Sequence, residues 1–581
     1  MPQDPRRGAR HSGALQYSGV TGWRGGTVQL VTSPLRIRWL GTVPYREALA
    51  VQEAAFGHGT EQHLLLLEHP HVFTYGRRSD LDHNLRCNPA DVGADFVAVS
   101  RGGDITYHGP GQLVGYPILS VANKLGAAEH VRNVEQLVID TLAAFGVSAG
   151  RLADYPGVWV DATGPNPRKI CAIGVRLKGG RTMHGFALNI ATDMAYMREH
   201  IVACGIGDRP VTSLREEGVE ASMHDVVDVL ARLAGERWGN GAVERQDVAW
   251  RHRVDDLSPF SRGAGAGETV RPDREATPVR LRSRLDEAGV AEGLSISTRK
   301  PDWLRPKVHH TNEVLDLKRT IRSLGLVTVC EDAGCPNLSE CWADGTATFM
   351  VLGERCTRAC GFCLIDTRRP DAPARDEPQR VAEAIDQMAL DHAVLTMVAR
   401  DDLRDGGMAH VAACVEAIRL RRPSAVVETL ISDAKGDGNS LDALFAVRPD
   451  VLNHNMETVA RLQRAVRPSA GYARSLSVLS RAKAAGLVTK SGFMAGLGER
   501  DDEIAGLLAD LASIGVDIVT IGQYLRPTSN HIPVDRWVEP ERFTEWAELG
   551  ESLGIGHVEA SPLTRSSYHA KAAAAGVIAH A

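Results

Sequence analysis

The chain has 581 residues, of which 43% are hydrophobic and 24% charged; this composition is that of a globular protein and excludes pervasive disorder, collagen and coiled coil. Its 66 basic and 72 acidic residues give a net charge of −6, which argues against a protein that coats nucleic acid. No apolar run approaches the roughly 18 residues of a membrane span. We therefore expect no nucleic acid and no membrane among its partners.

The number and positions of the cysteines indicate the cellular compartment of the protein. Six of the ten cysteines fall between Cys330 and Cys363. A disulfide-rich secreted scaffold is usually a short chain, whereas this one is long and has no signal-peptide pattern. We therefore expect a cytoplasmic protein whose clustered thiolates hold metal.

Composition divides the chain into four parts. Residues 1–33 carry four arginines and a single acid among Gly, Ser and Thr; we expect a disordered tail, with an organelle-targeting peptide as the alternative. Residues 34–250 are expected to form an α/β domain. A linker at 251–283, which contains the Gly263–Gly267 run, would join it to a second domain at 284–581.

Hydrophobic periodicity gives the first domain its predicted elements. Strands are expected at Phe96–Ser100, Gln112–Leu119 and Lys169–Leu177, and a helix at Val131–Phe145. Period-two alternation would place Lys169 and Cys171 on the same face of their strand.

A glycine-rich segment precedes the second of these strands: Arg101-Gly102-Gly103-Asp104-Ile105-Thr106-Tyr107-His108. Glycine lets the backbone approach a ligand closely, although a hairpin with a polar loop has a similar composition. With the segments Lys169–Val175, His184–Asn189 and Cys204–Ile206, the motif resembles the lipoyl(octanoyl) transferase family over residues 35–235. The resemblance implies the α/β fold of the biotin and lipoate protein ligases.

That family moves an octanoyl group from a carrier thioester to a lysine amine. The resemblance implies that Cys204 is the nucleophile and Lys169 its activator, because a nearby ammonium favours the thiolate and the deprotonated lysine can serve as base. Cys171 is the rival nucleophile; alternatively, Cys204 is a buried structural thiol and Lys169 a surface lysine. The acyl tunnel and oxyanion position would be lined by Arg101–His108, by Ala172, Ile173 and Gly174, and by Gly185, Phe186 and Ala187.

A ligase on the same fold is the alternative for this domain. Such an enzyme uses ATP to form an acyl-adenylate and needs no cysteine nucleophile. Cys204, followed by Gly and Ile, therefore favours the transferase.

In the second domain, strand-like and helical patterns alternate. This alternation predicts a parallel sheet with right-handed crossovers, closed or partly closed into a (β/α) barrel. The predicted strands are Thr346–Leu352, Ala393–Val398, Ala425–Ile431, Asp450–Asn455, Leu487–Met494, Val516–Leu525 and His557–Ala560.

Two cysteine triplets accompany the first of these strands. Cys356, Cys360 and Cys363 follow it, and three thiolates at this spacing can hold a cubane iron–sulfur cluster whose fourth iron stays open. A zinc site is the alternative, but structural zinc normally takes four ligands, often as paired C-x2-C units. The preceding triplet, Cys330, Cys335 and Cys341, then predicts a second cluster rather than zinc.

The triplets belong to a longer pattern that resembles lipoyl synthase, a radical S-adenosylmethionine (SAM) enzyme, over residues 295–572. The further segments are Ala347–Met350, Arg400–Leu403, His454–Thr458, Gly496–Glu499, Thr520–Leu525 and Arg565–Ala570. Biotin synthase, which also inserts sulfur, lacks the upstream triplet. A non-catalytic iron–sulfur carrier is the alternative from a different functional class.

The lipoyl synthase resemblance implies two [4Fe–4S] clusters. Cys356, Cys360 and Cys363 would hold the one that cleaves SAM to a 5′-deoxyadenosyl radical, which abstracts hydrogen from C6 and C8 of a protein-bound octanoyl chain. The other would be consumed as the sulfur donor. Its ligands would be Cys330, Cys335, Cys341 and a serine, Ser567 or secondarily Ser566.

The two resemblances together predict a bifunctional enzyme of lipoate biosynthesis. The partners that they imply are octanoyl-acyl carrier protein, the lipoyl domains of 2-oxoacid dehydrogenase complexes, and the H-type protein of glycine cleavage. An electron donor such as ferredoxin or flavodoxin would reduce the cluster.

Overall fold

The computed structural model describes residues 34–77, 79–121, 126–239, 242–250, 279–290, 293–305, 319, 321, 324–328, 337–343 and 346–578. The predicted tail, residues 251–278 of the predicted linker, Cys330 and Cys335 lie outside the described residues.

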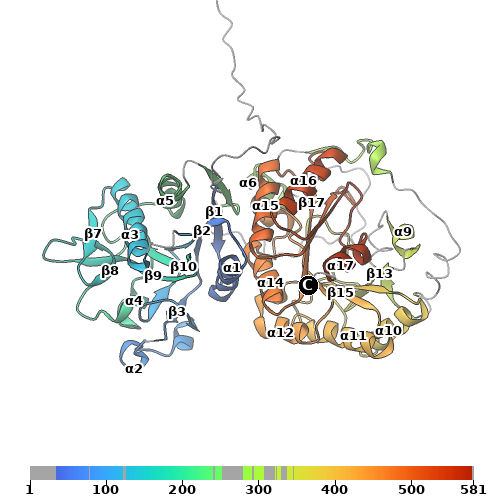
Figure 1. The fold of residues 1–581 in the computed structure, drawn as a ribbon, viewed down its shortest axis with the longest axis horizontal. Helices are drawn as coiled ribbons and strands as arrows, with labels where there is room; N and C mark the ends of the chain where they lie inside the picture. The colour runs from blue at the N-terminus through green and yellow to red at the C-terminus, as the bar shows by residue number, and fades with distance from the viewer. Residues whose placement is uncertain are drawn as a thin grey trace, which may run out of the picture.

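The N-terminal part of the chain is built on a mixed eight-stranded sheet (Figure 1). In its first strand, β1 (Leu35–Thr42), apolar residues alternate with Arg36 and Arg38, so that the two arginines share one face of the strand. The strands run in the order β11 (Val243–Asp247), β1, β2 (Gln62–Glu68), β6 (Gln112–Ile118), β10 (Arg181–Asn189), β9 (Arg168–Lys178), β8 (Tyr155–Val160) and β7 (Ala149–Leu152).

A three-stranded sheet lies beside it and carries the glycine-rich segment. Its order is β4 (Asp95–Ala98), β3 (Val72–Tyr75) and β5 (Thr106–His108). Short helices pack around it: α2 (Leu81–Asn84), η1 (Pro89–Val92), α4 (Ala195–Glu199) and η2 (Ala203–Gly205). The predicted strands of this domain correspond to β4, β6 and β9.

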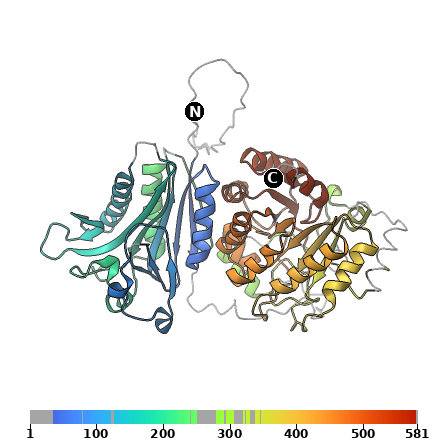
Figure 2. The same cartoon turned by 60° about the horizontal axis from the view of Figure 1, so that its bottom comes forward.

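Helices cover both faces of the large sheet. The predicted helix is α3 (Ala127–Ala144), which packs on one face with α5 (Met223–Trp238). The other face is covered by α1 (Tyr45–Gly57), which lies between the sheet and the C-terminal part of the chain (Figure 2). The predicted α/β fold of the N-terminal domain is confirmed.

The C-terminal part of the chain forms the predicted parallel sheet. All seven predicted strands are present, each paired in parallel with the next; a short antiparallel strand, β12 (Val327–Thr328), is added at the edge. They are β13 (Thr346–Val351), β14 (His392–Met397), β15 (Val426–Leu430), β16 (Val451–Asn453), β17 (Val488–Ala495), β18 (Ile518–Gln523) and β19 (His557–Ala560).

Amphipathic helices pack on the outside of this sheet and curve it into a partial barrel (Figure 1). They are α10 (Glu377–Gln387), α11 (Met408–Arg421), α12 (Gly438–Ala446), α14 (Tyr472–Ala484), α15 (Asp501–Ser513) and α16 (Pro540–Ser552). Short elements include η5 (Ala434–Gly436), η6 (Ala460–Leu462) and α13 (Gln463–Val466), while α9 (Leu338–Ala343) and α17 (Ala570–Ile578) flank the barrel. The predicted partial barrel is confirmed.

The two halves share one hydrophobic core. Ala48, Val51 and Ala55 of α1 belong to the same buried cluster as Leu476 and Leu479 of α14. The helix α6 (Val279–Glu287), which begins inside the segment predicted as linker, adds two buried leucines to this cluster. The halves are therefore packed against each other as well as joined in sequence.

A buried ion pair crosses this interface. Arg38 Nε lies 2.9 Å from Asp510 Oδ2, and the two side chains are 2% and 4% exposed. The Tyr472 hydroxyl donates to the same carboxylate at 2.8 Å. A charge buried to this degree must be paired. Asp510 of the C-terminal half therefore needs Arg38 of the N-terminal half.

Among the helices that the structure describes, none has both the length and the apolar character that a membrane crossing requires.

Candidate active sites

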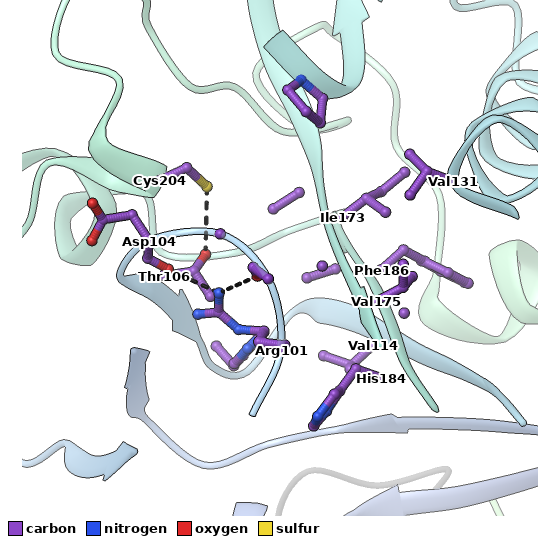
Figure 3. A pocket seen from close by; sticks show the side chains of 18 of the residues that line it. Arg101, Asp104, Thr106, Val114, Val131, Ile173, Val175, His184, Phe186 and Cys204 are labelled. Atoms are coloured by element: carbon purple, nitrogen blue, oxygen red, sulfur yellow. Dashed lines mark hydrogen bonds between the residues drawn. The ribbon is translucent and has the colours of Figure 1, made fainter. Parts of the chain in front are cut away.

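The predicted residues of the N-terminal domain meet at one cavity of about 290 Å³, between the glycine-rich segment and the strands β6, β9 and β10. All of them line it except Ile105 and Tyr107. Polar groups gather on one wall, where Cys204, Asp104, Thr106 and Arg101 lie, and apolar side chains form the opposite wall (Figure 3). Such a cavity suits a small ligand with an apolar chain and one polar end.

Ile105 and Tyr107 point away from the cavity. Both are buried in a separate apolar cluster, and the Tyr107 hydroxyl lies 2.7 Å from His71 Nδ1. Ile105 still acts on the site through its backbone, because its carbonyl accepts the Cys204 N–H at 2.8 Å. The alternation of β5 explains the difference, since neighbouring residues of a strand face opposite sides.

Cys204 lies on a tight turn in the left-handed region, with φ 59° and ψ 20°. Gly205 follows with φ 69°, and a Cβ there would lie 3.0 Å from Asp104 Oδ2. The sulfur lies 3.9 Å from Thr106 Oγ1 (Figure 3). Backbone strain at a non-glycine residue is typical of functional sites.

Lys169 is buried, and both its backbone and its side chain are held by neighbouring residues. It is 6% exposed, its backbone N–H donates to the Pro210 carbonyl at 2.9 Å, and its ammonium lies 5.5 Å from the centre of the Trp159 ring. Gly157 makes room for it, since a Cβ there would lie 2.8 Å from Lys169 Cε. This lysine is therefore no surface side chain.

The predicted shared face of Lys169 and Cys171 does not hold. The pairing of β8 with β9 shifts register between Val158 and Trp159, so β9 carries an extra residue at this point. A β-bulge of this kind interrupts period-two alternation. Cys171 packs in the apolar core instead of lining the cavity, and burial raises the pKa of its thiol far above the usual range.

Arg101 lies on the polar wall of the cavity, where hydrogen bonds hold its guanidinium in place. Its guanidinium donates to the Asp104 carbonyl at 2.8 Å and to Thr74 Oγ1 at 2.9 Å. Asn84 in turn donates to Asp104 Oδ2 at 2.9 Å. These bonds hold the glycine-rich segment in the shape that places Arg101 beside Cys204.

Several lining residues have no signal in the sequence. Tyr45, the first residue of α1, and Tyr116, of β6, form part of the wall. His69 lies behind them, with Nε2 2.8 Å from the Tyr116 hydroxyl. Burial lowers the pKa of His69 and of His184, which lines the cavity, to about 4, so both imidazoles are neutral at pH 7.

The second site lies on the loop that follows β13. Its backbone is tied to the barrel at several points. The Cys356 N–H donates to the Asp366 carbonyl at 2.8 Å, and His531 Nε2 lies 2.9 Å from the Cys363 carbonyl. The loop thus places Cys356, Cys360 and Cys363 at the carboxyl ends of the strands, where enzymes of this architecture carry their sites.

The three thiols of this loop are close enough to influence one another. Burial, with a smaller contribution from neighbouring thiols, raises the pKa of Cys360 and of Cys363 to about 12. Burial also raises the pKa of Cys356. Among the described residues, no three Cys, His, Asp or Glu side chains close around one point as the ligands of a single ion do. Half-buried sulfurs that share one loop fit a cluster, whose cationic irons would favour the thiolate form.

A buried arginine supports this loop, and the sequence motifs did not identify it. Arg358 is two residues from Cys356 and its backbone N–H donates to the Cys356 sulfur at 3.4 Å. Its guanidinium donates to Asp401 at 2.8 Å and to Asp433 at 2.6 Å. Burial alone would raise the pKa of Asp433, but Arg358 and then Arg474 hold it well below its usual range.

Of the upstream triplet, only Cys341 lies among the described residues. It is on α9, which packs beside the C-terminal turn that carries Ser566 and Ser567. Asn337 donates to the Leu563 carbonyl at 2.6 Å, and the Tyr568 hydroxyl donates to Glu340 Oε1 at 3.2 Å. The structure therefore brings Cys341 to the predicted serine turn.

Two family models match separate parts of the chain. The "Lipoyl protein ligase A/B catalytic domain" matches residues 44–233 and the "Radical SAM superfamily" matches residues 350–511. With the two folds described above, these matches define a protein that joins a catalytic domain of the lipoate ligase and octanoyltransferase type to a radical SAM domain. The predicted combination is confirmed.

Comparison with individual proteins identifies the family of the radical SAM domain more closely. Lipoyl synthase of Rubrobacter xylanophilus is 52% identical over 273 residues, which cover 47% of this chain and 85% of that protein. Lipoyl synthase of Nocardia farcinica is 50% identical over 282 residues, 48% of this chain and 80% of that protein. A crystal structure of lipoate-protein ligase A bound with ATP is similar at 18% identity and a TM-score of 0.32, over 37% of this chain and 89% of that one. The chain belongs to the lipoyl synthase family.

Proposed function

We propose that the chain performs two consecutive steps of lipoate biosynthesis. The N-terminal domain would transfer octanoate from octanoyl-acyl carrier protein to a lysine of a lipoyl domain, and the C-terminal domain would insert two sulfurs into that bound chain. The observation that carries the proposal is the single cavity lined by both Cys204 and Lys169, on the same polypeptide as a lipoyl synthase domain.

In the first step, the Cys204 thiol passes its proton to Lys169 and attacks the carbonyl carbon of the octanoyl thioester; the carrier sulfur leaves and takes that proton back from Lys169, which is then neutral. The acceptor lysine then attacks the Cys204 thioester through its amine. Lys169 takes the proton that this amine loses, and the Cys204 sulfur leaves as the amide forms. The apolar wall around Phe186 would hold the acyl chain.

Two features favour a transferase over an ATP-dependent ligase. A ligase would have no use for Cys204 on its strained turn. It would also have to hold a nucleotide beside the acyl chain, and the cavity of about 290 Å³ is just below the range of about 300–1,000 Å³ for ligand pockets.

In the second step, the residues of the chain would hold cofactors and orient the octanoyl-lysine arm. Cys356, Cys360 and Cys363 would ligate one [4Fe–4S] cluster; Cys330, Cys335, Cys341 and Ser567 would ligate the other. Ser566 is the less suitable ligand, because its hydroxyl already accepts a hydrogen bond from Asn455 Nδ2 at 2.7 Å. When bound, the clusters and SAM would supply the radical and the sulfur atoms.

The partners follow from these steps. The acceptor would be the lipoyl domain of a 2-oxoacid dehydrogenase complex or the H-type protein of glycine cleavage, and ferredoxin or flavodoxin would supply electrons. We place both steps in the cytoplasm. Because the octanoyl arm stays on the acceptor, the acceptor must move from the first site to the second.

The intact mass of an apo lipoyl domain tests the proposal. The domain is incubated anaerobically with the full-length, cluster-reconstituted protein, octanoyl-acyl carrier protein, SAM and a reductant. A lipoyl mass is the expected result, and an octanoyl mass alone would leave only the first step standing. An unmodified acceptor that ATP and free octanoate then convert would replace the transferase with a ligase.

A further inference from the structure

The helix α1 belongs to the transferase-type domain, yet its first turn contacts both halves of the protein. Tyr45 lines the acyl cavity. Glu47, two residues on, points to the opposite side of the helix, since successive residues are separated by about 100°. Its carboxylate accepts a hydrogen bond from Arg474 Nε of α14 at 2.8 Å, and its side chain is 8% exposed.

Arg474 connects this carboxylate to the loop that follows β15. The loop consists of residues 433–436, and we call it the Asp433 loop. Arg474 Nε lies against this loop, since a Cβ on Gly436 would be 3.3 Å from it, and the charge of Arg474 lowers the pKa of Asp433. A Cβ on Gly436 would clash with Glu47 Oε1, which shows how closely the loop packs against the pair.

The Asp433 loop also contacts the cluster loop. Asp433 is fully buried and accepts from Arg358 Nη2 at 2.6 Å, and Lys435 Nζ donates to the Asp401 carbonyl at 2.8 Å. Three successive residues of the loop have positive φ: Ala434 at 45°, Lys435 at 54° and Gly436 at 79°. Two of the three carry a side chain, so this conformation is held by its surroundings rather than by local preference.

We infer that Glu47 of the transferase-type domain is a positioning residue for the radical SAM site. It holds Arg474, which steadies the Asp433 loop, and through Asp433 and Arg358 it fixes the loop of Cys356, Cys360 and Cys363. The inference rests on the proposed ligation of a cluster by these cysteines. It gives the fusion a structural role, because a lipoyl synthase domain without the first domain would lack Glu47.

The test compares variants of the full-length, reconstituted protein. Glu47→Gln keeps the size of the side chain and removes its charge, and Arg474→Gln removes the other partner. Two readouts are taken: the electron paramagnetic resonance spectrum of the reduced protein with and without SAM, and the KM for SAM in 5′-deoxyadenosine formation. We expect a shifted spectrum and a KM raised about tenfold, the lower end of what outer-shell changes cost.

Two controls separate a specific effect from a general one. Glu53→Gln makes the same change at an exposed position of α1. Gln246→Ala removes an interface contact away from the Asp433 loop, where Gln246 Nε2 donates to the Asp502 carbonyl at 2.8 Å. We expect both to keep the wild-type spectrum and KM.

The outcomes distinguish the inference from the function on which it rests. A wild-type spectrum and KM in Glu47→Gln and Arg474→Gln would overturn the inference and leave the proposed function intact. An equal effect of Gln246→Ala would also overturn it, since the interface as a whole would then be responsible. Wild-type protein whose cluster spectrum does not respond to SAM would overturn the proposed function itself.

Discussion

In the N-terminal half, the groups proposed to react are side chains of the chain itself, and they line one cavity. In the radical SAM half, the side chains around the site are ligands and charges that would hold groups acquired from outside. Cysteine has a different environment in each half. Both Cys204 and Cys360 are half-buried, but Cys204 lies on a strained turn beside Thr106, whereas Cys360 shares its loop with two other cysteines and partial burial raises the pKa of its thiol to about 12.

The comparison shows that surroundings, more than residue type, decide what a thiol can do. A nucleophile needs access and polar neighbours, and a ligand can be buried because the metal supplies the compensating charge. Cys171 has neither access nor polar neighbours, because it lies in the apolar core, although it is only two residues from Lys169.

The largest effect is expected from Cys204→Ser. Octanoyl transfer should fall at least about 10³-fold, because a hydroxyl is a much weaker nucleophile than a thiolate and residues that act as a unit fail together. Sulfur insertion on a pre-octanoylated lipoyl domain should be unchanged. Intact-mass analysis of the acceptor measures both. Cys171→Ser is the matched control, and transfer that persists in Cys204→Ser but disappears in Cys171→Ser would move the nucleophile to Cys171.

Cys356→Ala should give the reverse pattern. Loss of one of three ligands should abolish SAM cleavage, which is followed as 5′-deoxyadenosine by chromatography, and octanoyl transfer should be unchanged. Cys414→Ala is the control, because that cysteine is buried on the apolar side of α11. Normal cleavage in Cys356→Ala would remove the role that we propose for its triplet.

A smaller effect is expected where the halves meet. Asp510→Asn removes one of the two carboxylates that pair with the buried Arg38, the other being Glu244 at 2.7 Å, and should destabilise the protein by about 2 kcal/mol. Calorimetry should show a lower Tm for the transition in which the interface is lost. Asp502→Asn, at an exposed position of the same helix, should have little effect. Equal Tm values for the two variants would show that the ion pair does not hold the interface.

The same ion pair should respond to acid. Burial alone would raise the pKa of Asp510, but Arg38 and the Tyr472 hydroxyl hold it below its usual value. A lowered folded-state pKa gives stability that is complete above the unfolded value of about 3.9 and is lost as pH falls through the folded value. The difference in Tm between wild type and Asp510→Asn should therefore shrink below about pH 4.

Much of the architecture was predictable because it depends on local patterns. The seven barrel strands are short apolar runs between helical stripes, and each was predicted to within a few residues, as β13 and β19 illustrate. The cysteine triplet after β13 could be found in the sequence for the same reason, since the proposed cluster ligands are neighbours in the chain.

What the sequence did not reveal depends on partners that are remote in the chain. Glu47 and Arg474 are separated by 427 positions and belong to no motif. The β-bulge that separates Cys171 from Lys169 arises from pairing with β8, which no periodicity within β9 could indicate. Tyr45 lines the acyl cavity only because α1 packs across the sheet.

The smallest effect is expected from Gly157→Ala, which tests whether the first site needs the space that Gly157 leaves beside Lys169. Its φ is +119°, and a Cβ would lie 2.5 Å from the Cys171 carbonyl and 2.8 Å from Lys169 Cε. Gly157→Ala should therefore cost about 2 kcal/mol in strain, and by displacing Lys169 it should lower octanoyl transfer about tenfold.

Gly146→Ala is the matched control for Gly157→Ala. Gly146 also has a positive φ, at +77°, but a Cβ there would meet nothing within 4 Å. It should share the loss of stability, measured as Tm, and keep wild-type transfer. If both variants lose transfer in proportion to Tm, strain alone explains the effect, and Lys169 does not need the space that Gly157 leaves. If only Gly157→Ala loses transfer, the position of this ammonium limits the first site.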